Sequence, residues 1–540
     1  MVSEWLSTWL IATVAISVLI SGILLRQLAH PDVKFPALLV VLLSWSLSLT
    51  VVWVAPLDLD MGQIEPELLT PVWMVAYWTT SLLTWLIIPI QQAYYDSGHF
   101  NWRDKLREAI RSNLQFYVYA GVLIAAVAVA VAVTSGLAAA NLLTLAMALA
   151  NIWGLFLMVV LLGYGLVDIP RKLWNFGNTQ LRARALYFQA VAIHDEYQDS
   201  TELISDTISM VEMASTKVKN LDDEKLTSYM DIIEAACPQH DSISTVNEFI
   251  PSDLAAELRD NPITEHLLAK LHYRVKKDYH ENRRAEFEWN SLLDRLKQIE
   301  TEEAAKISNY AIHRTFRGIF NLHVLARLLS AILWIVTFAV IWCEITLSID
   351  VRYSIFYVVI QKFNSPPVTY MVGLILISYL AMCAFYSMFR LRLSSFYHLH
   401  FGGHSEANSL LFNASFILRL IFPLGINFFS TTLLDRGATT SFETAVGQMN
   451  VVPVLGQKFN LFVPVVISVL CLVTGCNLYG RLLRLLQISQ FEENGPGSDQ
   501  IVAEGESLVR RQRRKRARNI ISNRTVAGGY LQLGQSHGSP

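Results

Sequence analysis

The chain has 540 residues, of which 53% are hydrophobic, 11% aromatic and only 16% charged, and its mean hydropathy is +0.37. Soluble globular proteins carry charge on about a quarter of their residues, so this composition excludes an ordinary soluble protein and predicts extensive contact with lipid. The formal net charge of -2 argues against nucleic acid as a partner, because binding to phosphate needs a basic face.

Nine segments are apolar over a length that can cross a bilayer as a helix, for which about 20 residues are needed. In chain order they cover residues 5–25, 36–56, 71–93, 114–134, 141–167, 319–347, 368–388, 407–431 and 459–480. The sequence therefore predicts an all-α, polytopic integral membrane protein with about nine transmembrane helices. Residues 1–167 form an N-terminal membrane region with five of them, and residues 319–480 form a C-terminal membrane region with four.

The charges of the short loops predict the orientation of these helices. The loop after the third segment is basic and contains Arg103, Lys105, Arg107 and Arg111. The loop after the second segment has neither Lys nor Arg and contains Asp58, Asp60, Glu65 and Glu67. Because Lys and Arg accumulate on the cytosolic side, we expect the N-terminus outside and the C-terminus in the cytosol.

Residues 168–318 form a polar insert in which apolar residues recur every three or four positions, the pattern of amphipathic helices. One stripe consists of Ile204, Ile208, Val211 and Val218, and a second of Ala285, Trp289, Leu292, Leu296 and Ile299. Pro238, Pro251 and Pro262 interrupt the segment between them. This pattern predicts a cytosolic, coiled-coil-like antiparallel helical hairpin with a broken connector. Either the two stripes pack on each other, or one face docks a cytosolic partner.

Residues 481–540 form a cytosolic tail rich in Glu, Gly, Ser and Asp that then becomes basic, a composition that predicts disorder. The basic residues are Arg510, Arg511, Arg513, Arg514, Lys515, Arg516 and Arg518. They form either a solvated helix face or a patch that contacts anionic lipid on the inner leaflet.

The sequence contains none of the common catalytic, nucleotide-binding or calcium-binding motifs, which favours a non-enzymatic protein without a cofactor. The five cysteines lack the spacing of a metal site, and we expect no bound metal. His398, His400 and His404 have a spacing that would suit a metal on a turn, but no Cys or Asp completes a ligand set. We interpret them as polar residues at the membrane boundary whose protonation makes the loop pH-sensitive.

Arg419 lies near the middle of the segment 407–431, where an unpaired charge costs several kcal/mol. Asn408 and Ser415 share its helical face, and Asn413 and Asn427 lie nearby. Glu344 in the sixth segment is one candidate partner for this charge, and the neighbouring Asn side chains and the carbonyls freed by Pro423 are others. These six residues form a candidate intramembrane polar network, which serves either the structure alone or the binding of a substrate or ion.

Several short motifs resemble a known family. They are Asn408-Ser409-Leu410-Leu411-Phe412-Asn413-Ala414, then Arg419-Leu420, Pro423-Leu424 and Asn427-Phe428, with Phe389-Arg390-Leu391-Arg392 before the histidine loop and Gly447-Gln448-Met449 after it. The chain resembles the limb-region-1-like, lipocalin-receptor-like membrane proteins, in their domain-containing-protein-2 branch. This resemblance implies five helices, a cytosolic insert and four further helices. It also implies relatives that act as lipocalin receptors, as a lysosomal cobalamin-export partner or as plasma-membrane regulators of G-protein-coupled receptor signalling.

Two functions follow as hypotheses. The first is a multi-pass adaptor or receptor of the plasma membrane or endosomal system, which binds a receptor in the membrane and signalling or trafficking proteins in the cytosol. The alternative is a transporter or uptake receptor for a lipophilic small molecule or a lipocalin-type carrier.

Overall fold

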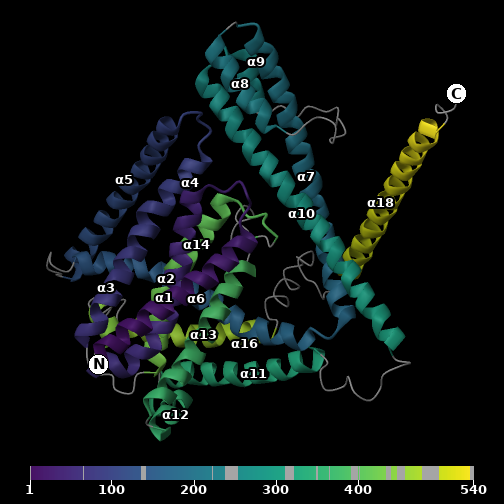
Figure 1. The fold of residues 1–540 in the computed structure, drawn as a ribbon. Coiled ribbons are helices and arrows are strands. Elements are labelled where there is room, and N and C mark those ends of the chain that lie inside the picture. Colours follow the sequence, from purple (N-terminus) through teal and green to yellow (C-terminus); the bar gives the residue numbers. More distant parts are fainter. Residues whose placement is uncertain are drawn as a thin grey trace. The chain divides into compact units, whose positions relative to one another are not determined.

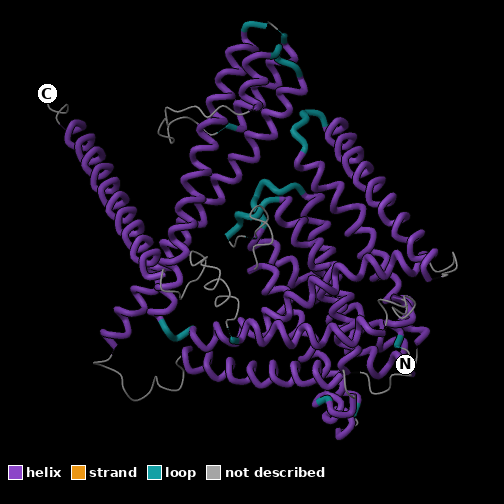
Figure 2. The backbone as a smooth tube through the Cα atoms, turned by 180° about the vertical axis from the view of Figure 1, so that it is seen from behind, coloured by secondary structure: helices purple, strands orange, loops and turns teal. Residues whose placement is uncertain are grey.

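The computed structural model describes residues 2–64, 66–135, 142–221, 223–237, 253–309, 322–347, 351–363, 365–390, 399, 402–432, 440–446, 457–476 and 498–535. Every regular element in these ranges is a helix (Figures 1 and 2). The chain divides into two compact units. The membrane unit comprises Met1–Lys172 and Leu329–Cys476, and the hairpin unit comprises Leu173–Leu328 and Asn477–Pro540.

The membrane unit contains the following helices in chain order. They are α1 (Val2–Leu28), α2 (Phe35–Ile64), α3 (Pro66–Leu82), the π-helical turn η1 (Leu83–Ile87), α4 (Ile88–Asp96), α5 (Trp102–Ser135) and α6 (Leu142–Asn175), then α11 (Leu322–Leu347), the 3-10 turn η4 (Val351–Tyr353), α12 (Ile355–Phe363), α13 (Pro366–Arg390), α14 (Ala407–Thr432), α15 (Ser441–Val446) and α16 (Gln457–Gly475). Helix α2 is central, because α1, α3, α13, α14 and α15 all pack against it.

Among the described residues, 7 helical segments are long and apolar enough to cross a membrane. They are Leu6–Leu28, Phe35–Leu59, Leu69–Asp96, Gly154–Asn175, Val324–Thr346, Pro366–Phe389 and Ala407–Thr432. The prediction of an all-α polytopic membrane protein is thus confirmed. The predicted segment 114–134 lies within α5 and the segment 459–480 overlaps α16, but neither is among the seven, so the count of nine stays a prediction.

The side chains of α1 have the reverse of the pattern found in soluble proteins. Thr13, Ser17 and Ser21 are buried, whereas Ile11 and Leu19 are 70% and 64% exposed. Small polar residues let membrane helices approach closely, and hydrocarbon accommodates the large apolar residues on the other side. The outward face of α1 is therefore suited to lipid.

Glycines on α6 allow equally close packing in the membrane unit. A Cβ atom on Gly163 would lie 2.5 Å from Leu470 Cβ of α16. A Cβ atom on Gly165 would collide with the carbonyl oxygen of Cys383 and the hydroxyl of Ser387, both on α13. Only a residue without a side chain lets α6 approach the backbone of α13 at this point.

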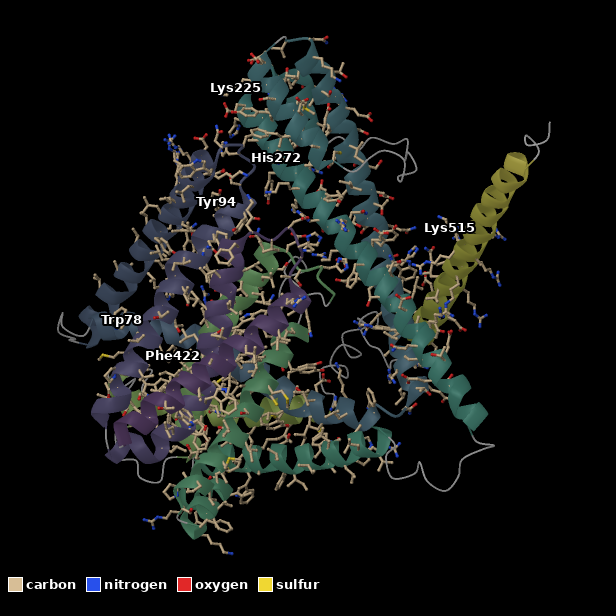
Figure 3. The ribbon with its side chains drawn as sticks, viewed as in Figure 1. Trp78, Tyr94, Lys225, His272, Phe422 and Lys515 are labelled. Carbon is tan, nitrogen blue, oxygen red and sulfur yellow. The ribbon has the colours of Figure 1, made fainter. Side chains whose placement is uncertain are left out.

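The hairpin unit consists of α7 (Thr179–Lys219), α8 (Glu224–Ala236), α9 (Asp253–Asp260), α10 (Glu265–Asn309) and α18 (Ser498–Gln535). Helices α7 and α10 pack side by side as the predicted antiparallel hairpin. Their hydrogen bonds show the antiparallel direction, because residue numbers rise along α7 while those of the partners on α10 fall. Thr179 pairs with Glu303, Glu196 with Arg284, and Thr207 with Asp278. Figure 3 shows Lys225 of α8 and His272 of α10 toward the end of the hairpin at which α8 and α9 lie.

Both predicted stripes contribute to the contact between α7 and α10. All their members are buried except Ile208, which is half-buried. Pro262 lies between α9 and α10, and Pro238 and Pro251 lie outside the described residues.

The structure differs from the expected disorder of the tail, because residues 498–535 form helix α18. Val509 of α18 is buried in a cluster with Ala190 and Ile193 of α7 and with Trp289 and Leu292 of α10. Burial raises the pKa of the Tyr187 phenol, which packs at the edge of this cluster. Helix α18 therefore packs as a third helix against α7 and α10.

Candidate functional site

Glu344 and Asn427 form the most deeply buried polar pair among the predicted site residues. Asn427 Nδ2 donates to Glu344 Oε1 at 2.8 Å, and the two residues are 4% and 0% exposed, respectively. The second carboxyl oxygen, Oε2, has no hydrogen-bond partner within the described structure. This hydrogen bond between the amide of Asn427 and the carboxyl group of Glu344 joins α14 to α11.

Two other predicted residues of α14 bond elsewhere, and a third is buried. Asn408 donates to Asp96 at the end of α4. Asn413 donates to the carbonyl oxygen of Ser409, one turn earlier in its own helix, at 2.8 Å. Ser415 is buried. The residues share one helix, but they do not form a single connected network in the described structure.

Arg419 has an aromatic partner instead of the predicted carboxylate. Its guanidinium carbon lies 5.5 Å from the ring centroid of Trp85, a cation–π geometry. Its Nε atom is buried and has no hydrogen-bond partner among the described residues. Glu344, the acidic partner considered from the sequence, bonds Asn427 instead, so the pairing of Arg419 with Glu344 is not present.

Proline residues explain the backbone around Arg419. Pro89 has no N–H, so the carbonyl of Trp85, four residues earlier, lacks its helical donor. The hydroxyl of Tyr117 on α5 donates to this carbonyl instead. Pro423 likewise frees the carbonyl of Arg419 itself. Each of these two carbonyl oxygens lacks a backbone donor because a proline lies four residues later in the chain. This spacing can be read from the sequence.

Gly154 of α6 packs against the freed carbonyl of Arg419, which lies 2.7 Å from where a Cβ atom on this glycine would be. Trp85 itself sits in the π-helical turn η1, in which the N–H of Ile88 reaches back to the carbonyl of Leu83. Such turns often occur at functional sites, because the additional residue redirects a side chain. Here the turn carries the tryptophan that contacts Arg419.

Asp58, predicted to be a charge in an outer loop, is buried at the end of α2. Its Oδ2 atom accepts hydrogen bonds from Trp73 Nε1 at 3.1 Å and from the backbone N–H of Phe442 at 2.9 Å. Phe442 lies in the first turn of α15, so the carboxylate satisfies a free donor at a helix start. Asp58 thus joins α2, α3 and α15.

Pro170 in α6 gives rise to a second set of side-chain hydrogen bonds to the backbone. Pro170 frees the carbonyl of Leu166, and Thr337 Oγ1 donates to that carbonyl at 2.9 Å. Ser330 Oγ donates to the carbonyl of Pro170 at 2.6 Å. Ser330, Thr337 and Glu344 are spaced seven apart on α11 and are all buried, so they form its polar face toward the rest of the unit. The seven-residue spacing of Ser330, Thr337 and Glu344 is visible in the sequence.

The predicted histidine cluster can be followed only in part, because His398 and His400 lie outside the described residues. The ring of His404 lies 6.5 Å from that of His30. Gly402 and Gly403, both with positive φ, donate to the carbonyl of Gln27 at the end of α1. Where the structure describes the chain, no three His, Cys, Asp or Glu residues are placed to hold a metal ion.

The predicted basic patch divides between two faces of α18. Arg513 Nη1 bonds both carboxylate oxygens of Glu300 at 2.8 and 2.9 Å, and Arg516 bonds Asn290, so both face α10. Arg510 pairs with Glu506 in its own helix. The remaining members line an open groove together with Ser507 and Arg510; they are Arg511, Arg514, Lys515 and Arg518, and Figure 3 shows Lys515 on α18.

The apolar spans, the inward polar faces and the separate helical hairpin define a polytopic helical membrane protein with a docked C-terminal helix. Residues 5–479 match the family of LMBR1-like membrane proteins. The chain belongs to this family, and the resemblance seen in its motifs is confirmed.

Several curated proteins are similar to this chain over most of its length. The human G-protein coupled receptor-associated protein LMBRD2 is 29% identical, with 84% of this chain and 70% of that protein covered. The zebrafish (Danio rerio) G-protein coupled receptor-associated protein LMBRD2B is 30% identical, with 84% and 69% covered. LMBR1 domain-containing protein 2 homolog A of Dictyostelium discoideum is 27% identical, with 85% and 64% covered. No solved structure matches the chain.

Proposed function

We propose that this protein is a non-enzymatic adaptor that associates with G-protein-coupled receptors in the membrane and regulates their signalling or trafficking. The names of its relatives carry this proposal, since they describe receptor-associated proteins that match over more than 80% of the chain. In our proposal the membrane unit contacts the receptor, and the hairpin unit binds cytosolic factors.

Two features of the structure support this division of roles. The outward faces of α1 and α11 carry many large apolar side chains; Ile335 and Phe338 of α11, for example, are 70% and 66% exposed. Such faces suit either lipid or the helices of another membrane protein. The hairpin unit has its own buried core, so it can present a fixed surface to a soluble partner.

The first test is the orientation of the chain. With a tag before α1 and another after α18, we expect antibodies to reach the first tag on intact cells and the second only after permeabilisation. The positive charge at the start of α5, where Arg103 and Arg107 lie, favours this orientation. Labelling of the C-terminal tag on intact cells would contradict the cytosolic placement of the hairpin unit.

The second test separates the two proposed contacts. In Gly505→Leu, the new side chain would collide with the backbone carbonyl of Tyr187, so we expect α18 to leave the hairpin. Proximity labelling should then lose cytosolic proteins and retain the receptor. Hydrogen exchange of the α18 amides would verify that the helix has been released.

The matched control is Ala503→Leu, which adds the same side chain to an exposed position two residues away on α18. We expect its labelled proteins to match those of the unmodified chain. If α18 is released in Gly505→Leu and yet the cytosolic partners are unchanged, the hairpin unit is not their binding surface.

A further inference from the structure

Among the described residues, no carboxylate forms an ion pair with the guanidinium of Arg419. Arg419 lies halfway along the 26-residue helix α14, roughly 18 Å from either end at 1.5 Å per residue. At this depth a cation without an anionic partner is costly. The ring of Trp85 supplies only part of the compensation that an anion would give.

Each carboxylate within the seven apolar spans is already bonded to another group. Asp58 accepts from Trp73 and Phe442, and Asp96 accepts from Asn408. Tyr386 donates to Asp168 at 2.8 Å, and Asn427 donates to Glu344. None of these carboxylates forms an ion pair with Arg419 in the described part of the chain, which leaves the guanidinium able to pair with the acidic group of a ligand.

The surroundings of Arg419 are open to lipid on one side. Trp85 and Leu86 are 47% and 46% exposed, and on α5 Phe116, beside Tyr117, is 59% exposed. Tyr117 ties α5 to the carbonyl of Trp85. The guanidinium therefore lies next to the half-exposed ring of Trp85, and the exposed side chains near it are apolar and can contact lipid.

We propose that Arg419, Trp85 and Tyr117 form a binding site for the acidic head of a single-chain lipophilic carboxylic acid, whose hydrocarbon chain extends into the bilayer. An oxygen of the acid accepts a hydrogen bond from the Arg419 guanidinium. A carboxylic acid can reach this depth in its neutral form, whereas the phosphodiester of a phospholipid keeps its charge and stays at the interface. The site is independent of the proposed receptor association.

The experiment uses the purified full-length protein in nanodiscs and a photoactivatable, clickable analogue of palmitic acid. We expect crosslinks on peptides that contain Trp85, Phe116 or Arg419. Unlabelled palmitic acid should compete at least about tenfold better than its methyl ester, because the ester cannot ionise to a carboxylate that pairs with the guanidinium. This arm needs no substitution and so does not depend on the folding of a variant.

A second arm uses Arg419→Gln, with Arg327→Gln, an exposed arginine of α11, as the matched control. Crosslinking should fall about tenfold in the first variant and stay unchanged in the second. Equal competition by acid and ester would overturn the proposal, as would crosslinks confined to other peptides. So would better competition by phosphatidic acid than by palmitic acid, which would assign the site to phospholipid headgroups.

Discussion

Replacing Trp289 by alanine is expected to reduce the free energy of local opening of the hairpin unit by about 3–5 kcal/mol. Trp289 is 1% exposed and lies in the cluster shared by α7, α10 and α18. The ring of His194 packs edge-on against it, with the centroids 5.1 Å apart. Removing the indole leaves a cavity that three helices would have to collapse to fill. Hydrogen exchange of the α7 and α10 amides measures this loss.

The control for this variant is Tyr273→Ala, which removes a 41% exposed aromatic ring from the same helix, α10. We expect it to change the free energy of opening by less than about 1 kcal/mol. Similar protection in Trp289→Ala and in the unmodified chain would show that the three-helix core does not stabilise the unit.

Replacing Gly165 by leucine is expected to destabilise the membrane unit by about 3 kcal/mol or more, because the collision involves the backbone of α13 and not a movable side chain. The midpoint of thermal unfolding in detergent, followed by size-exclusion chromatography with a fluorescent fusion, measures the effect. A large fraction of the protein should elute as aggregate.

Gly121→Leu is the matched substitution, since a Cβ atom at Gly121 of α5 would meet no atom within 4 Å. Leucine also favours a helix over glycine by up to about 1 kcal/mol. We expect this variant to be as stable as the unmodified protein. Equal unfolding midpoints for the two variants would contradict the close approach of α6 and α13.

Hydropathy predicted the class of the protein and the positions of seven spans because the length and apolarity of a membrane helix are local properties. The hairpin was predictable for the same reason, since its stripes repeat along each helix. Helix α18 was missed because charge dominates its composition. Its contact face is short, with Gly505 and Val509 one turn apart, and becomes apparent only against α7 and α10.

The polar residues of α14 were found, but their partners were not. Helical spacing places Asn408, Ser415 and Arg419 on one face, yet it does not say which helix lies opposite. The bonds instead join Asn408 to α4, Arg419 to the turn η1 and Asn427 to α11. The relevant sequence pattern is the position of each proline, because Pro89, Pro170 and Pro423 each free a carbonyl four residues earlier. The assignment of these residues to a site stays a prediction.

The docking of α18 has a consequence for synthesis of the protein. About 200 residues separate Leu296 of α10 from Val509 of α18, and the predicted membrane helices of residues 319–480 lie between them. At about 5–20 residues per second, a ribosome needs roughly 10–40 s to cover this distance. For that interval the nascent hairpin holds an uncovered apolar strip around Ala190 and Trp289, which a chaperone would have to shield until the last helix emerges.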